Sequence, residues 1–168
     1  MSQELVTYII LGSKVRLAKV KHFKTDVHEQ CIHLNYNNNI EQAIDLAVTK
    51  SNGGLIVLLP PSSIPNVESR ATLKKISLVN VSAWGWFKYN SKRKNLTQNL
   101  GKISTFLSGV PALEQGLFFS KRLYFSIGGI GEVGSSPFAE ISKRFQSRLD
   151  PQKPLPALSI RTKNLKLS

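Results

Sequence analysis

The sequence predicts an α/β sandwich built around a mostly parallel β-sheet, and three observations support this fold class. Short apolar runs alternate with segments of helical periodicity through the first half of the chain. The run Leu55–Leu59 is continuously apolar and is followed by two prolines, which is typical of a central parallel strand covered on both faces. With 168 residues, 41% of them hydrophobic, the chain can bury one substantial core, so we expect a single domain.

The elements of the first half follow from periodicity and from helix start and stop signals. Asn39 is a candidate N-cap for a helix that presents Ile40, Ala43, Ile44 and Ala47 on one face. We expect, in order, a buried strand at Leu5–Leu11, a short helix at Ser13–Phe23, a strand at Val27–Leu34, the capped helix at 40–51, the central strand, and a short helix at Glu68–Ile76.

The pattern changes after Ile76. We expect a long strand at Ser77–Tyr89, a helix at Thr97–Val110, a strand at Gly116–Ser120, a glycine loop, a helix that starts at Ser136 and Pro137, and a final strand at Pro156–Thr162. Alternation along these strands predicts that Trp84, Trp86, Phe87, Phe118 and Phe119 serve mainly in core packing rather than as ligand platforms.

The glycine loop contains the spacing Gly129-x-Gly131-x-x-Gly134, which raises the question of whether it binds a dinucleotide phosphate. A dinucleotide fingerprint needs a strand before the glycines, a helix after them and an acidic residue beyond the next strand. Asp150 precedes the last strand-like run instead of following it. The sequence therefore favours another role for these glycines.

The net charge of +13 is confined to one part of the chain. Residues 1–68 carry six Lys or Arg and six Asp or Glu, whereas residues 69–168 carry seventeen basic and four acidic residues. Such a surface attracts polyanions, so we expect non-specific binding to an anionic surface or polymer. No apolar run is long enough for a transmembrane helix, and the single Cys31 excludes an internal disulfide. We expect a cytoplasmic protein, with the membrane periphery as the alternative location.

Metal and nucleophile motifs are weak. His28, Cys31 and His33 share one short segment, but a tetrahedral metal site would need a further ligand, and no second cysteine exists. No serine lies in a G-x-S-x-G context. The chain has three aspartates and no Asp-x-Asp pair, so a carboxylate site for Mg²⁺ or Mn²⁺ has no obvious source.

Five short segments nevertheless form a recognisable series. They are Trp84-Gly85-Trp86-Phe87, Glu114-Gln115-Gly116-Leu117-Phe118, Lys121-Arg122, Gly128-Gly129-Ile130, and Glu140-Ile141-Ser142-Lys143-Arg144. In order and spacing they resemble the second half of bacterial family 2 glycosyltransferases. The resemblance implies a single-domain fold of the nucleotide-diphospho-sugar transferase (GT-A) type, a three-layer sandwich with a mixed, mostly parallel sheet. It would span residues 1–162, start one strand and one helix into the family's domain, and leave 163–168 as a basic tail.

The resemblance also implies a function and a set of site residues. The family transfers a sugar from a nucleotide-sugar donor to an acceptor, usually with Mg²⁺ or Mn²⁺. By position, the catalytic candidates are Glu114 and Glu140, with Glu132 as a further candidate base. The candidates for donor or acceptor binding are Gly12, Ser13, Trp84, Gln115, Lys121, Arg122, Gly128 and Gly129.

Three departures coincide with functional positions of the family. Pro137 and Phe138 stand where the acceptor base is expected, Leu59-Pro60-Pro61 stands where a metal-ligating aspartate is expected, and Arg16 lies near the acidic position of the nucleotide turn. No cofactor is firmly implied, and catalysis is left open. One hypothesis is a sugar transferase with weakened or lost activity. The alternative is an inactive relative that acts as a binding partner through its basic C-terminal half.

Overall fold

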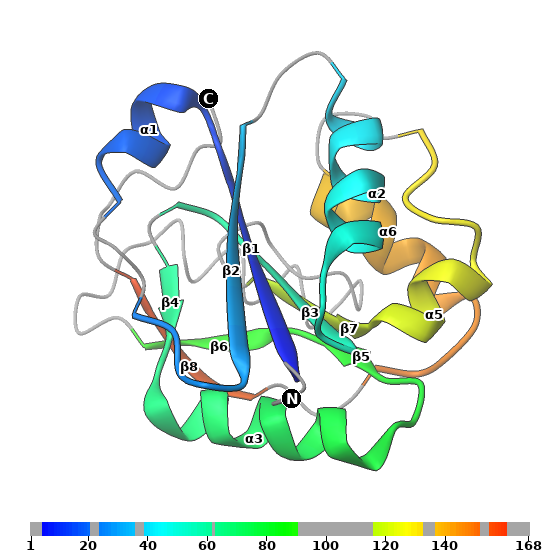
Figure 1. Cartoon of the computed structure of the whole chain (residues 1–168). Helices are drawn as coiled ribbons and strands as arrows, with labels where there is room; N and C mark the ends of the chain where they lie inside the picture. Colours follow the sequence, from blue (N-terminus) through cyan, green and yellow to red (C-terminus); the bar gives the residue numbers. More distant parts are fainter. Residues whose placement is uncertain are drawn as a thin grey trace.

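The computed structural model describes residues 5–20, 24–35, 39–61, 63–90, 116–132, 137–151 and 155–160. It confirms an α/β fold whose main sheet has five strands in the order β2-β1-β3-β7-β5 (Figure 1). In sequence order these strands are β1 (Val6–Gly12), β2 (Glu29–Asn35), β3 (Leu55–Leu59), β5 (Trp84–Gly85) and β7 (Leu117–Ser120). The strand β1 pairs in parallel with β2 and β3, whereas β7 runs antiparallel to β3 and β5.

Two neighbouring interior strands of the main sheet are buried along their whole length. Every residue of β1 and of β3 is buried, which explains why β3 is a continuous apolar run and β1 a nearly continuous one, without alternation. Ile9 and Ile56 face one layer of helices, and Tyr8 and Val57 face the opposite layer. The expected central position of β3 is therefore confirmed.

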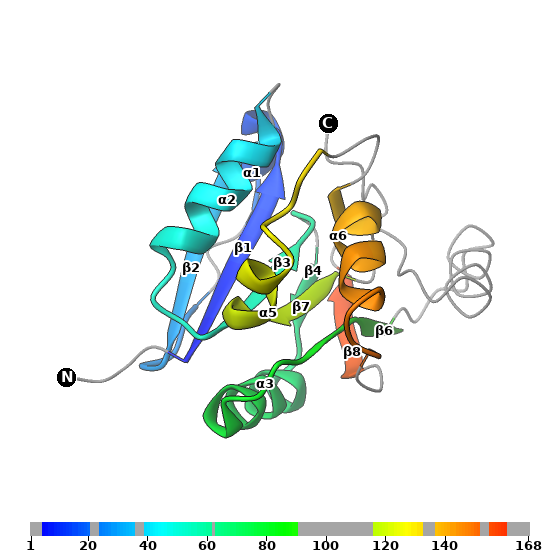
Figure 2. The same cartoon turned by 90° about the vertical axis from the view of Figure 1, so that its right-hand side faces the viewer.

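Three helices cover one face of the sheet (Figure 2). They are α2 (Ile40–Lys50), α5 (Lys121–Ser126) and α6 (Pro137–Gln146). Their buried residues, among them Ile44, Leu123 and Phe145, pack with β1, β3 and β7 in one hydrophobic cluster. Each large apolar side chain buried in this way contributes about 1.5–3 kcal/mol. This cluster fixes α5 and α6 against the sheet.

The opposite face is covered by α3 (Val67–Val79) and by a second, three-stranded sheet. The second sheet has the order β4-β8-β6, with β4 (Ser63–Pro65), β6 (Phe87–Asn90) and β8 (Leu155–Ile160). Leu73 of α3 and Phe87 of β6 pack against the main sheet on this side. The short helix α1 (Lys14–Ala18) follows β1 directly. Layers on both faces of the main sheet give the three-layer arrangement.

The prediction of one long strand over Ser77–Tyr89 is wrong. Helix α3 continues to Val79 and ends at Asn80, whose φ of 52° lies in the left-handed region that asparagine tolerates better than most residues. The strand that follows is also divided, because Trp84–Gly85 pairs in the main sheet and Phe87–Asn90 joins the second sheet. The expected helix at Thr97–Val110 lies outside the described residues.

The expectation that the glycine loop directly follows the strand at Gly116–Ser120 is also wrong. Helix α5, which the sequence analysis did not predict, separates β7 from the glycines. The side chain of Ser120 caps this helix by accepting a hydrogen bond from the backbone N–H of Leu123, at 3.3 Å. Gly128, Gly129 and Gly131 then adopt positive φ angles of 81°, 81° and 68°. The glycines therefore end a helix, and the strand that a dinucleotide fingerprint needs before them is missing.

Candidate functional site

The predicted nucleotide turn lies at the carboxyl end of β1. Gly12 is the last residue of that strand, and Ser13 precedes α1 without a side-chain capping hydrogen bond. Pro61, just past β3, packs against Gly12 so closely that a Cβ atom at Gly12 would overlap the proline ring. Ligands of open α/β sheets usually bind beyond the carboxyl ends of the strands. At this edge the space next to Gly12 is taken by the ring of Pro61.

The predicted basic pair lies at the other end of the central strands. The backbone N–H of Lys121 donates to the carbonyl of Gly54, which immediately precedes β3, at 2.8 Å. The Lys121 ammonium donates to the carbonyls of Thr49 and Ser51 at 3.0 and 2.9 Å. These carbonyls lie at the C-terminal end of α2, where a positive charge is favourable. Lys121 therefore has a structural task.

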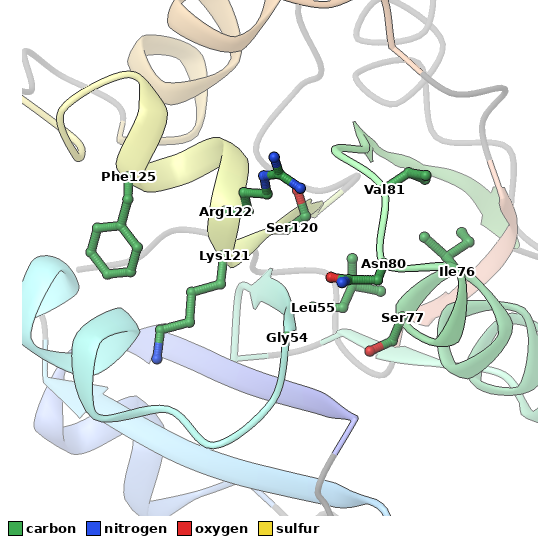
Figure 3. Close-up of a pocket in the computed structure, with 10 residues that line it drawn as sticks. All are labelled: Gly54, Leu55, Ile76, Ser77, Asn80, Val81, Ser120, Lys121, Arg122 and Phe125. Atoms are coloured by element: carbon green, nitrogen blue, oxygen red, sulfur yellow. The ribbon is translucent and has the colours of Figure 1, made fainter.

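Arg122, the second member of the pair, has a different environment. Its side chain is exposed, and it forms no hydrogen bond or ion pair with the described residues. Together with Lys121 it lines a pocket of about 250 Å³ between α3 and α5 (Figure 3). Of the two basic residues, Arg122 is thus the one whose charged group is available to a ligand.

The glycine turn holds a carboxylate from the same chain. Asp45, in the middle of α2, accepts a hydrogen bond from the backbone N–H of Ile130 at 3.2 Å and another from the hydroxyl of Tyr124. A Cβ atom at Gly129 would lie 2.7 Å from Asp45 Oδ1, whereas one at Gly128 would meet nothing within 4 Å. Burial, with the hydrogen bond to Asp45, raises the pKa of Tyr124 above its usual range. An internal anion therefore occupies the part of the turn next to Gly129.

Two further predicted residues lie in ordinary structural settings. Trp84 is fully buried, and its indole N–H donates to the carbonyl of Leu149 at 2.6 Å. This confirms its core packing, which Phe87, Phe118 and Phe119 share. Glu140, on α6, forms a partly exposed ion pair with Lys143 at 3.6 Å. Glu114 and Gln115 lie outside the described residues, and Glu132 is exposed after the turn.

The described candidates therefore do not converge on one place. Gly12 and Ser13 lie at the carboxyl end of β1, whereas Lys121 and Arg122 lie near its amino end, because Val6 pairs with Leu55. A seven-residue strand spans roughly 20 Å. The glycine turn forms a third location, beside α2 on one face of the sheet.

Sequence reasoning missed a charged network on the other face. The side chain of Glu29, at the start of β2, is fully buried and forms an ion pair with Arg70 of α3. Lys74, one turn further along α3, lies 3.4 Å from Glu29 and 2.7 Å from Asp26. The hydroxyl of Tyr8 donates to Glu29 Oε1 at 3.3 Å. The spacing of Arg70 and Lys74 on one helix face was the signal available, but nothing in it identified Glu29 as their partner.

The chemistry of the remaining candidates is limited. Burial raises the pKa of the Cys31 thiol to about 11, so the thiol stays protonated and poorly nucleophilic near neutral pH. Within the part of the chain that the structure describes, no three His, Cys, Asp or Glu side chains gather closely enough to hold a metal ion. Among the described helices, none has the length and apolar character needed to span a bilayer. The sequence matches no protein-family model, and no curated protein is significantly similar to it.

Proposed function

We propose that the chain is a glycosyltransferase-like domain of the nucleotide-diphospho-sugar transferase type that retains ligand binding but not metal-dependent sugar transfer. Support for the scaffold comes from the segments that carry the resemblance. The Trp84–Gly85 strand pairs with β7, with Trp84 opposite Phe119. Phe145 of α6 contacts both rings, with ring-centroid distances of 5.7 and 5.0 Å. Segments that match in sequence order are thus also packed together.

The contact between Gly12 and Pro61 is the main support for the proposed loss of metal-dependent chemistry. The resemblance places the nucleotide turn and the metal-ligating aspartate at the carboxyl ends of β1 and β3. A proline stands after β3 where the aspartate is expected, and the ring of Pro61 fills the space beside Gly12 in the nucleotide turn. Proline has neither a carboxylate nor a backbone N–H, so its side chain cannot coordinate Mn²⁺ and its backbone cannot donate a hydrogen bond to a diphosphate.

Nucleotide-sugar binding with and without Mn²⁺ tests this proposal. Calorimetry with UDP-, GDP- and TDP-sugars should show weak binding whose affinity does not increase with Mn²⁺, and a radiolabelled-sugar assay should show no transfer or hydrolysis. Affinity that depends on Mn²⁺ and is abolished by substitution of one aspartate would contradict the loss of metal chemistry. If none of these nucleotide sugars bound, the proposal that the domain retains nucleotide-sugar binding would be contradicted.

A second candidate function rests on charge alone. The whole excess of +13 lies in residues 69–168. An inactive relative with such a surface would act as a binding partner for an anionic polymer or membrane surface. Nucleotide-sugar binding would favour the first proposal, whereas salt-sensitive polyanion binding without it would favour the second.

A further inference from the structure

A pocket of about 250 Å³ opens between the end of α3 and α5 (Figure 3). It lies beside Leu55, which pairs with Val6 at the opposite end of β1 from Gly12. Leu55, the first residue of β3, lines the pocket and is itself almost fully buried. Ile76 and Val81 line the pocket from the α3 side, and Phe125 lines it from α5. Apolar side chains from three separate elements thus surround one space.

Large apolar side chains are unusually exposed around this pocket. Val81 is 52% exposed and Phe125 is 50% exposed. Leu78 and Val79, in the last turn of α3, are also exposed, at 67% and 65%, but they do not line the pocket. Exposed apolar side chains in the lining of a pocket, with polar neighbours, mark an interaction surface.

The same surface is positively charged. The exposed guanidinium group of Arg122 lines the pocket and has no partner among the described residues. Lys121 adds a second positive charge to the lining. None of the pocket's described lining residues is acidic. A partner with negative charge would therefore meet no opposing carboxylate within the pocket.

We propose that this pocket docks an acidic segment of another protein that carries one large apolar side chain. The apolar side chain fills the pocket, and a flanking carboxylate pairs with Arg122. Arginine binds carboxylates through two parallel hydrogen bonds, which orients the segment. The pocket is smaller than a typical small-molecule site of roughly 300–1,000 Å³.

A peptide selection tests the proposal with the full chain. Ten-residue peptides with a fixed central Phe and flanks randomised among Asp, Glu, Lys, Ser and Ala are selected at physiological salt. Selected peptides should be rich in Asp and Glu, and they should shift the backbone amide NMR signals of Leu55, Val81 and Phe125. Arg122→Glu should weaken their binding by about tenfold or more, because the variant replaces attraction with repulsion. Val81→Ser should weaken the binding of the same peptides, because it removes an apolar contact in the pocket.

The matched control is Arg148→Glu, which makes the same charge change at an exposed residue after α6, outside the pocket. It should leave peptide binding unchanged. Arg122→Glu should not impair folding, because a negative charge in the first turn of α5 suits the helix dipole, and thermal unfolding checks this. Four outcomes would overturn the proposal: no selected peptide, a Lys-rich consensus, an equal loss with Arg148→Glu, or phenyl phosphate binding as tightly as the best peptide.

Discussion

The carboxylate of Asp45 accepts a hydrogen bond from the backbone N–H of Ile130, 85 residues further along the chain, at 3.2 Å. The contact joins the middle of α2 to the turn after α5. Positive φ angles at Gly128 and Gly129 bring the backbone into this position. The glycines thus allow the turn to bind the carboxylate of Asp45. In a dinucleotide site a phosphate would take the place of this carboxylate.

The first prediction compares alanine at two neighbouring glycines. Both Gly128 and Gly129 have a φ of 81°, so either substitution costs about 1 kcal/mol in backbone strain. Gly129→Ala should cost about 2 kcal/mol in total, because its Cβ atom would also displace Asp45. Urea unfolding measures the difference. Wild type and both variants should fail to bind NAD(H). Equal destabilisation, or NAD(H) binding by the wild type alone, would refute this account of the turn.

The second prediction concerns the adjacent glycines before β3. A Cβ atom at Gly53 would lie 2.7 Å from the backbone nitrogen of Thr7, whereas one at Gly54 would meet only Ser77 Oγ at 3.7 Å. Gly53→Ala must therefore push β1 and β3 apart, at a cost of about 2–3 kcal/mol. Gly54→Ala should change the free energy of unfolding by less than about 0.5 kcal/mol. Similar unfolding midpoints for the two variants would contradict this packing.

The parts of the fold that the sequence predicted are those in which local pattern and burial agree. β1 and β3 are buried along their whole length and consist mainly of apolar residues. The prediction failed at Ser77–Tyr89, because Leu78 and Val79 are apolar but exposed on a helix. Propensity and pattern could not distinguish an exposed apolar helix end from a buried strand.

The candidate site was harder to predict because its contacts are long-range. Asp45 meets Ile130, and Glu29 meets Arg70, across 85 and 41 residues. No local pattern records which loop returns to which helix. Lys121 and Arg122 are adjacent in sequence, yet one binds the carbonyls of α2 and the other is exposed. Their different roles depend on where α5 begins, which the sequence did not reveal.

The third prediction uses the pH dependence of the buried Glu29–Arg70 pair. Burial alone raises the pKa of Glu29, but hydrogen bonds from Arg70 and from the backbone N–H of Asp26 outweigh it and hold the pKa below 4.5. The folded pKa is therefore lower than the unfolded one, and the unfolded state takes up the proton first. This stabilisation is complete above about pH 4.5 and is lost as the pH falls further.

Arg70→Met should destabilise the protein by about 3 kcal/mol at pH 7, because it leaves a buried carboxylate without its main partner. That deficit should shrink as the pH approaches 4, since protonation of Glu29 removes the poorly paired charge. Urea unfolding between pH 4 and pH 7 measures both effects. The control is Lys75→Met, at an exposed position of the same helix, which should change stability by less than about 0.5 kcal/mol. A deficit for Arg70→Met that is independent of pH would rule out the charge explanation.

The fourth prediction separates the two members of the basic pair. Lys121→Met removes both hydrogen bonds to the carbonyls of Thr49 and Ser51 and the positive charge at the end of α2. We expect a loss of about 1–2 kcal/mol, since one of these bonds is exposed to solvent. Arg122→Met should be neutral in stability. Thermal unfolding of the two variants side by side decides the matter, and a larger loss for Arg122→Met would invalidate the assignment of roles.

The last prediction concerns polyanions. Residues 69–168 carry the whole charge excess, so binding to nucleic acid or anionic lipid should be weak, independent of sequence and steeply reduced by salt. The cluster Lys92, Arg93 and Lys94 lies outside the described residues and is the first place to test. Replacing all three with Gln should reduce the log–log salt slope by about one unit for each residue that contacts a phosphate.

A matched control replaces Lys14, Lys19 and Lys24 with Gln, because these exposed lysines lie in the charge-balanced part of the chain. This variant loses the same net charge but should keep its salt slope, if binding depends on local contacts rather than on total charge. Fluorescence anisotropy with a labelled poly-dT oligonucleotide at several salt concentrations measures both slopes. Equal reductions in the two variants would show that total charge alone governs binding. Tight binding to one defined sequence at high salt would instead require a specific nucleic-acid site.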